Sequence, residues 1–89
     1  MEVTFDPAKD AINLDKHGVS LQAAEDFDLT TAMTSVDDRR DYGEVRYRSL
    51  GYIGFTLHLF VFTVRDESLR AISLRRANKK EERRYAEDF

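Results

Sequence analysis

The sequence predicts an α+β fold in which helices pack against one antiparallel sheet of about four strands. Three observations favour this class: capped helical segments at both ends of the chain, three successive strand-like segments between residues 44 and 76, and a length of 89 residues. That length suits one domain, residues 1–89, and leaves no room for a second. We expect two N-terminal helices and one C-terminal helix around the sheet.

The N-terminal region is expected to contain a short strand and two helices. After a strand-like start at residues 3–5, Asp6 can cap a helix whose first position is Pro7. We expect this helix to end just before Gly18, since glycine adopts the left-handed conformation that closes helices. Ser20 resembles a second N-cap, for a brief helix with a short apolar stripe. The stripe consists of Leu21, Ala24 and Phe27.

The middle of the chain is expected to supply the strands. Residues 30–36 are the first candidate, and the charged residues 37–43 predict an exposed loop after it. Residues 44–52 alternate between apolar and charged side chains, which is typical of a half-buried strand. This alternation places three charged side chains on one strand face: Glu44, Arg46 and Arg48.

Two further strands are expected to complete an antiparallel meander. Residues 55–65 are β-branched or aromatic on both faces, so we expect them at the centre of the sheet, with Phe60 and Phe62 in the core. Residues 69–75 alternate in polarity again. Simple alternation there places Arg70, Ile72, Leu74 and Arg76 opposite Ala71, Ser73 and Arg75.

The C-terminal helix is expected to begin near Asn78, because Asn78 and Glu81 have the spacing of a capping box. Tyr85 and Phe89 are one helical turn apart, and we expect both to dock on the sheet. No internal repeat, low-complexity tract or linker interrupts the chain.

Composition excludes several function classes. The chain has no cysteine, which rules out disulfides, thiolate metal sites and cysteine nucleophiles. Its two histidines, His17 and His58, make metal catalysis unfavourable. There is no basic-then-apolar leader, and the longest apolar run, residues 52–64, is too short to span a bilayer. We therefore expect a cytoplasmic protein that uses no cofactor, no metal and no membrane.

Charge is distributed unevenly along the chain. The net charge of −3 argues against indiscriminate nucleic-acid binding. Residues 65–84 nevertheless hold eight basic and four acidic side chains, whereas residues 1–64 hold six basic and eleven acidic ones. A basic C-terminal third on an acidic body predicts one localised anion-binding face. The alternative is a solvated helix with ion pairs between neighbouring turns.

The first candidate cluster lies at the end of the first helix. Asn13, Lys16 and His17 share one helix face, and His17 has a pKa suited to moving a proton at neutral pH. The structural alternative is that the two cations complement the helix dipole.

The second candidate cluster is the charged face of the strand at residues 44–52. Arginines such as Arg46 and Arg48 supply planar, bidentate donors for phosphate, while a carboxylate such as Glu44 can accept a proton. Ion pairing on a solvated strand face is the structural alternative.

The third candidate cluster lies where the last strand meets the last helix. Arg75 and Arg76 are adjacent, and a short turn brings Arg65 near the start of the same strand. Lys79 and Lys80 load the positive end of the helix dipole, which is easier to tolerate if an anion binds there. Tyrosines near the central strand are open candidates for stacking on bases: Tyr42, Tyr47 and Tyr52.

Three stretches resemble the BrnT family, the toxins of bacterial type II toxin-antitoxin pairs. They are FDPAKDAINLDKHGVSLQAAEDF at residues 5–27, EVRYRSLG at 44–51 and RAISLRRANKKEERRYAE at 70–87. The resemblance covers almost the whole chain in order. The chain departs from the family's common pattern at Phe5, where tryptophan is usual, and at Asn78, where a hydroxyl residue is frequent.

The resemblance implies a RelE-like fold, metal-independent cleavage of RNA, and inhibition of translation and growth. It also implies a BrnA-like DNA-binding antitoxin, and the protein is expected to contact operator DNA only through this antitoxin. The implied substrate is mRNA, either free or bound to the ribosome. Carried over residue by residue, the resemblance points to charged positions that match the family motifs: Lys16, His17, Glu44, Arg46, Arg65, Arg75 and Arg76. The charged clusters described above supply the other candidates. The catalytic candidates are Lys16, His17, Glu44, Arg65, Arg75 and Arg76, and the RNA-binding candidates are Arg46, Arg48, Arg70, Lys79 and Lys80.

The expected mechanism uses the substrate's own 2′-hydroxyl as nucleophile. Glu44 or His17 would accept its proton, and guanidinium groups of the catalytic set would stabilise the charge on the phosphate. The alternative function is a non-catalytic module that binds nucleic acid or a partner, such as an inactive relic that binds antitoxin only.

Overall fold

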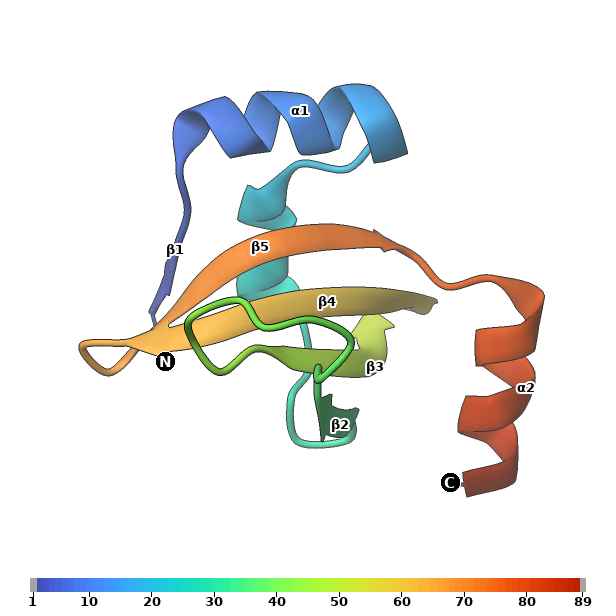
Figure 1. Ribbon diagram of the computed structural model, residues 1–89. Helices are drawn as coiled ribbons and strands as arrows, with labels where there is room; N and C mark the ends of the chain where they lie inside the picture. The colour runs from blue at the N-terminus through green and yellow to red at the C-terminus, as the bar shows by residue number, and fades with distance from the viewer. Residues whose placement is uncertain (1, 89) are drawn as a thin grey trace.

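The computed structural model describes residues 2–88. Within them, five strands form one mixed sheet in the order β1-β5-β4-β3-β2 (Figure 1). In chain order the elements are β1 (Val3–Thr4), α1 (Pro7–His17), the 3-10 helix η1 (Leu21–Asp26), β2 (Met33–Val36), β3 (Tyr47–Ile53), β4 (Thr56–Arg65), β5 (Ser68–Arg76) and α2 (Lys79–Asp88). None of the helices described is long and apolar enough to cross a membrane.

The first helix has the predicted ends and an unpredicted anchor. The Asp6 carboxylate accepts the Ala8 N–H at 2.9 Å, and Gly18 closes α1 with a φ of 71°. Asn13 fastens α1 to the edge of β5: its Nδ2 donates to the Leu74 carbonyl oxygen at 2.8 Å, and its Oδ1 accepts the Leu74 N–H. Because β1 pairs only with the first part of β5, this amide takes the place of a strand partner.

The predicted fold class is confirmed as α+β, but its details are wrong in two respects. The described sheet has five strands and is mixed, because β1 runs parallel to β5 and pairs Val3 with Leu69. A two-residue strand carries no sequence signal for its partner, so this pairing depends on tertiary contacts. The second N-terminal helix is a six-residue 3-10 helix, although Ser20 caps it as predicted by accepting the Gln22 N–H.

Three predicted strand boundaries are also corrected. Strand β2 begins at Met33 because the Asp28 carboxylate holds the two preceding threonines in a turn. Strand β3 begins at Tyr47, since residues 44–46 belong to the loop that precedes it. Phe55 lies in the β3–β4 turn and is fully exposed.

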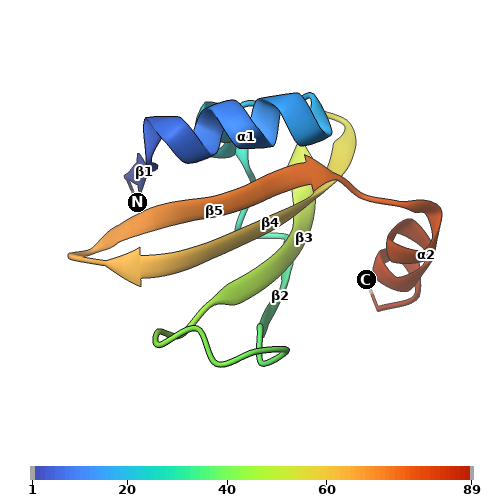
Figure 2. The same ribbon diagram turned by 45° about the horizontal axis from the view of Figure 1, so that its top comes forward.

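The meander β3-β4-β5 is confirmed, and β4 is the central strand. On one face, the sheet packs against α1 and η1 (Figure 2). That core contains Leu21, Ala24, Phe27, Phe60, Phe62, Leu69, Ala71 and Leu74. Gly51 belongs to this face because a Cβ there would come within 2.6 Å of the Phe27 ring. The opposite face carries a smaller cluster under α2, formed by Leu50, Leu57 and Leu59 with Tyr85 packed on it.

A bulge in β5 overturns the predicted alternation of that strand. Val61 pairs with Ser73 and Phe62 with Ala71, so Ile72 has no opposite residue on β4. The extra residue reverses which face the following side chains occupy. Leu74 therefore lies in the same core as Ala71, and Arg75 points to the face that carries α2.

The C-terminal helix has the predicted capping box. Asn78 N–H donates to Glu81 Oε1 at 2.9 Å, and Glu81 N–H donates to Asn78 Oδ1 at 2.8 Å. Tyr85 docks as expected, and its hydroxyl donates to the Thr31 carbonyl oxygen at 2.6 Å. Phe89, the other residue expected to dock, lies outside the described residues.

Candidate active site

Basic side chains line a cleft between α2 and the sheet. Helix α2 lies at the end of the molecule where β5 finishes (Figures 1 and 2). The volume of the cleft is about 330 Å³. The lining residues come from β3, β5 and the start of α2: Arg48, Arg75, Asn78, Lys80, Glu81 and Arg84. We call this the α2 cleft. Its composition makes it a candidate site for an anion.

Arg75 and Glu81 form a two-pronged ion pair in the α2 cleft. Arg75 Nη1 lies 2.8 Å from Glu81 Oε1, and Arg75 Nη2 lies 2.9 Å from Glu81 Oε2. The Glu81 side chain is 15% exposed and that of Arg75 is 30% exposed. Hydrogen bonds from Arg75 lower the pKa of Glu81, although partial burial opposes this. Glu81 therefore stays ionised at neutral pH.

Arg48 lies on the same sheet face as Arg75. In the register of the sheet, Arg48 is opposite Val61 and Arg75 is opposite Leu59, two residues apart on β4. Arg48 Nε is buried and, among the described residues, has no hydrogen-bond partner. A buried donor without a partner is costly, so a rearrangement that gave this atom an acceptor would be favourable.

The end of α1 approaches the same region from the other side of β5. Lys16 and His17 line a shallow pocket of about 260 Å³ together with Ile72 and Ser73. Partial burial lowers the pKa of His17 below its usual value, and the charges of Lys16 and Arg75 lower it further. His17 is therefore neutral at pH 7 and able to accept a proton. The structure thus places the predicted catalytic residues Lys16 and His17 at one pocket, and the charge of Arg75 on β5 acts on His17.

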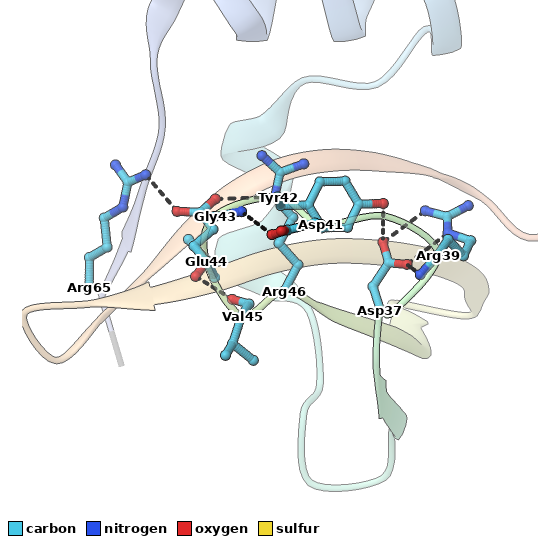
Figure 3. A network of polar contacts seen from close by, with 10 residues as sticks. Asp37, Arg39, Asp41, Tyr42, Gly43, Glu44, Val45, Arg46 and Arg65 are labelled. Carbon is cyan, nitrogen blue, oxygen red and sulfur yellow. Dashed lines mark hydrogen bonds and ion pairs between the residues drawn. The ribbon is translucent and has the colours of Figure 1, made fainter.

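A second cluster of charged residues lies in the loop before β3 (Figure 3). Glu44 accepts Arg65 Nη2 at 2.9 Å and Arg46 Nε at 3.1 Å, and both hydrogen bonds lower its pKa, with Arg65 the stronger cause. The Arg46 guanidinium lies 4.2 Å from the centre of the Tyr42 ring. Tyr42 in turn donates to the buried Asp37.

Asp37 completes this cluster with a second two-pronged pair. Arg39 Nε and Nη2 lie 2.7 and 2.8 Å from its two carboxylate oxygens. These hydrogen bonds hold the pKa of Asp37 far below its usual range. We call the whole set the loop network; its charged members are Asp37, Arg39, Asp41, Glu44, Arg46 and Arg65.

The Arg65 part of the loop network is remote from the α2 cleft, because Arg65 precedes the β4–β5 turn and α2 follows the other end of β5 (Figure 1). Arg65 is the last residue of β4, and six residues separate it from Leu59, which is opposite Arg75. At roughly 3.3 Å per residue this corresponds to about 20 Å. One phosphate therefore cannot contact both Arg65 and Arg75. The structure therefore groups Arg65 with Glu44 and Arg46 in the loop network, and Arg75 with Arg48 in the α2 cleft.

The remaining predicted residues lie near the α2 cleft or between the two clusters. Arg76 is exposed and lines a groove of about 620 Å³ beside Tyr52 and Tyr85. Arg70 is half-buried opposite Thr63. Lys79 and Lys80 are exposed in the first turn of α2.

The predicted residues omit Arg84, which also lines the α2 cleft. Its spacing was a usable signal, since Lys80, Glu81 and Arg84 lie on one helix face at intervals of three and four. Tyr47, an open candidate for base stacking, instead packs on Phe62 with ring centres 5.5 Å apart.

Within residues 2–88, no group of three or more histidine, cysteine, aspartate or glutamate side chains is placed to hold a metal ion. The α2 cleft offers guanidinium and ammonium groups, and the neutral imidazole of His17 lies in the separate pocket beside α1. Such cationic groups bind phosphate and stabilise added negative charge on it.

Comparison with protein families gives one match. The family model described as "Ribonuclease toxin, BrnT, of type II toxin-antitoxin system" matches residues 5–81. A search of curated proteins found no match. The matched region contains α1, the whole sheet beyond β1, and the first turn of α2, but it ends before Arg84 and Tyr85.

Proposed function

Since the chain belongs to the BrnT family of ribonuclease toxins from type II toxin-antitoxin systems, we propose that it is a metal-independent endoribonuclease acting where α1, β5 and α2 meet. One observation carries this proposal: Arg75 faces the α2 cleft and is also close enough to His17 to lower its pKa. We infer that the cations of the α2 cleft and the His17 imidazole act on the same scissile bond.

The guanidinium groups bind and stabilise the reacting phosphate. Arg75 and Arg48 present planar sets of N–H donors on one sheet face, and such donors match phosphate oxygens in pairs. They neutralise the charge that builds up on those oxygens, which is the role that metal ions have in other nucleases. One donor of this kind increases the rate of the catalysed reaction by a factor of about 10²–10³.

His17 accepts the proton of the attacking 2′-hydroxyl. The O2′–P bond forms, the P–O5′ bond breaks, and the products carry a 2′,3′-cyclic phosphate and a 5′-hydroxyl. The exposed Lys16 ammonium, next to His17, supplies the proton that the leaving 5′-oxygen needs. Arg70, Arg76, Lys79 and Lys80 contact the RNA backbone on either side.

Glu44 is less suited to be the base. Both of its carboxylate oxygens are engaged by arginines, which lower its pKa. A general base is most effective when its pKa lies near the working pH. We assign Glu44, Arg46 and Arg65 to holding the loop before β3.

The test is an RNA cleavage assay in EDTA with product-end analysis. We expect cyclic phosphate ends, full activity in the chelator, and loss of cleavage in the Arg75→Gln variant. Products that end in a free 3′-hydroxyl, or activity abolished by EDTA, would overturn the mechanism.

The family also supports proposals about partners and cell biology. We propose that the protein acts in the cytoplasm on mRNA, that it inhibits translation and growth, and that a BrnA-like antitoxin neutralises it. Operator DNA is contacted through that antitoxin. Induced expression should arrest growth, and co-expression of the neighbouring antitoxin gene should restore it. Unchanged growth on expression of folded protein would favour the non-catalytic alternative.

A further inference from the structure

We propose that the α2 cleft is a binding site for an RNA backbone phosphate formed by Arg48, Arg75 and Arg84, and that Glu81 fills it as an internal competitor. This inference builds on the proposed function and deepens it. RNA enters only when the Glu81 carboxylate leaves Arg75, either by rotation of its side chain or by movement of α2.

The charge of the α2 cleft is the first argument. Four cationic side chains and one carboxylate line the described cleft, which gives it a local charge of +3. Glu81 therefore leaves most of the positive charge uncompensated. A phosphate diester in the same position would be held by several cations at once.

The buried Nε of Arg48 is the second argument. It lies on the sheet face beneath α2 and has no partner in the described part of the chain. Arg48 is close enough to lower the pKa of Glu81, so the unpaired donor is near the carboxylate. A phosphate has more acceptor oxygens than a carboxylate and can satisfy both Arg48 and Arg75.

The contacts of Glu81 show why it can be displaced. Glu81 Oε1 caps α2 by accepting the Asn78 N–H, and this hydrogen bond does not need a charged acceptor. An amide oxygen at the same position would accept it equally well. The Glu81 carboxylate is hydrogen-bonded to one cation, Arg75, and interacts with Arg48 only through charge. Because carboxylate and phosphate accept the same pair of parallel N–H donors, the two anions compete for one partner.

Helix α2, which carries Glu81, is held to the sheet chiefly through one residue. None of its described residues is buried, and the half-buried Tyr85 packs on the smaller cluster, lies against the Tyr52 ring and donates to the Thr31 carbonyl oxygen. Segments with few buried apolar contacts open at low free-energy cost. The geometry therefore allows α2 to move without disturbing the core between the sheet and α1.

The first experiment compares Glu81→Gln with Glu82→Gln for binding a 2′-O-methyl RNA octamer, which cannot be cleaved. Both variants change the net charge equally, but only Glu81 pairs with Arg75. We expect Glu81→Gln to bind about fivefold more tightly than the unsubstituted protein, and Glu82→Gln less than about twofold more tightly. Equal effects of the two variants, or weaker binding by Glu81→Gln, would overturn the proposal.

The second experiment compares Arg84→Gln with Arg83→Gln, because Arg84 lines the cleft and Arg83 does not. Neither has an ion pair among the described residues, so both variants should fold. We expect Arg84→Gln to bind the octamer about fivefold more weakly, with a salt slope reduced by about 1, and Arg83→Gln to bind nearly normally. Equal weakening would refute the assigned site.

These readouts separate the two proposals. If the protein cleaves no RNA but the paired variants differ in binding as expected, the phosphate site stands and the ribonuclease mechanism fails. If RNA is cleaved but the two variants of each pair bind the octamer with equal affinity, the assignment of the phosphate site fails. Should Glu81→Gln prove unfolded by circular dichroism, the comparison of Arg84→Gln with Arg83→Gln decides the question alone.

Discussion

The loop network and the α2 cleft contain the same kinds of side chain in opposite states of balance. In the loop network three arginines pair with Asp37 and Glu44, and Asp41 in the same loop supplies a third carboxylate, so its local charge is zero. In the α2 cleft four cations meet one carboxylate, and a buried arginine nitrogen has no partner in the described structure. The loop network is satisfied internally, whereas the α2 cleft has binding capacity left over.

This difference indicates which cluster acts on a ligand. Arginines that are fully paired within a loop contribute to its order, and removing one leaves a carboxylate without its partner. Arginines in surplus repel one another until an anion arrives. Under the proposed function, charge balance, more than the number of arginines, therefore distinguishes the structural cluster from the binding site.

The largest expected effect tests directly whether catalysis takes place in the α2 cleft or in the loop network. Arg75→Gln should reduce RNA cleavage by about 10³-fold, because it removes a donor to the reacting phosphate. Arg65→Gln, the matched change in the loop network, should reduce cleavage by less than about threefold, as expected of a group remote from the scissile bond. Single-turnover rates with circular dichroism as a folding control provide the measurement. Similar losses in both variants would place catalysis in the loop network as well.

The second effect identifies the base. His17→Gln should reduce cleavage by about 10²-fold and remove the acid limb of the pH profile. In the unsubstituted protein that limb should have a midpoint below 6.5, since partial burial lowers the pKa of His17 and the imidazole must be neutral to accept a proton. A midpoint below 4.5 that persists in His17→Gln would instead indicate Glu44.

The third effect concerns stability and should be confined to the loop network. Asp37→Asn should lower the free energy of unfolding by about 1 kcal/mol at pH 7, because it weakens the hydrogen bonds from the partly exposed Arg39. The pKa of Asp37 is depressed, so its contribution is present above about pH 4 and is lost as the pH falls. Urea unfolding at pH 7 and pH 3 should show the difference between the two proteins shrinking at low pH. A cleavage rate changed more than threefold would contradict a purely structural role.

The smallest effect lies in the β4–β5 turn beside Arg65. Asp66 and Glu67 both have positive φ, at 49° and 65°, which favours glycine. Glu67→Gly should therefore raise the free energy of unfolding by about 0.5 kcal/mol, whereas Glu67→Ala, which keeps the Cβ, should give no gain. Cleavage should not change in either variant. Thermal unfolding checks this, and equal stability of the two variants would show that the turn is not strained.

Much of the fold followed from local sequence signals. The capping residues Asp6, Gly18, Ser20 and Asn78 all act as predicted because each bonds to backbone within a few positions of itself. The central strand was recognisable because both of its faces are apolar and buried. The start of β3 was misplaced, since the side chains of residues 44–46 make their contacts with the preceding loop and with Arg65.

By itself, the sequence determined the fold class, the family and the residue types of the site, because these depend on local patterns and on motifs read along the chain. The tertiary structure decided how the charged residues are grouped. The bulge at Ile72 places Arg75 on the α2 face, and the sheet keeps Arg65 and Glu44 at the far end. The physical reason is that facing direction and distance depend on pairing between strands, which no local pattern specifies.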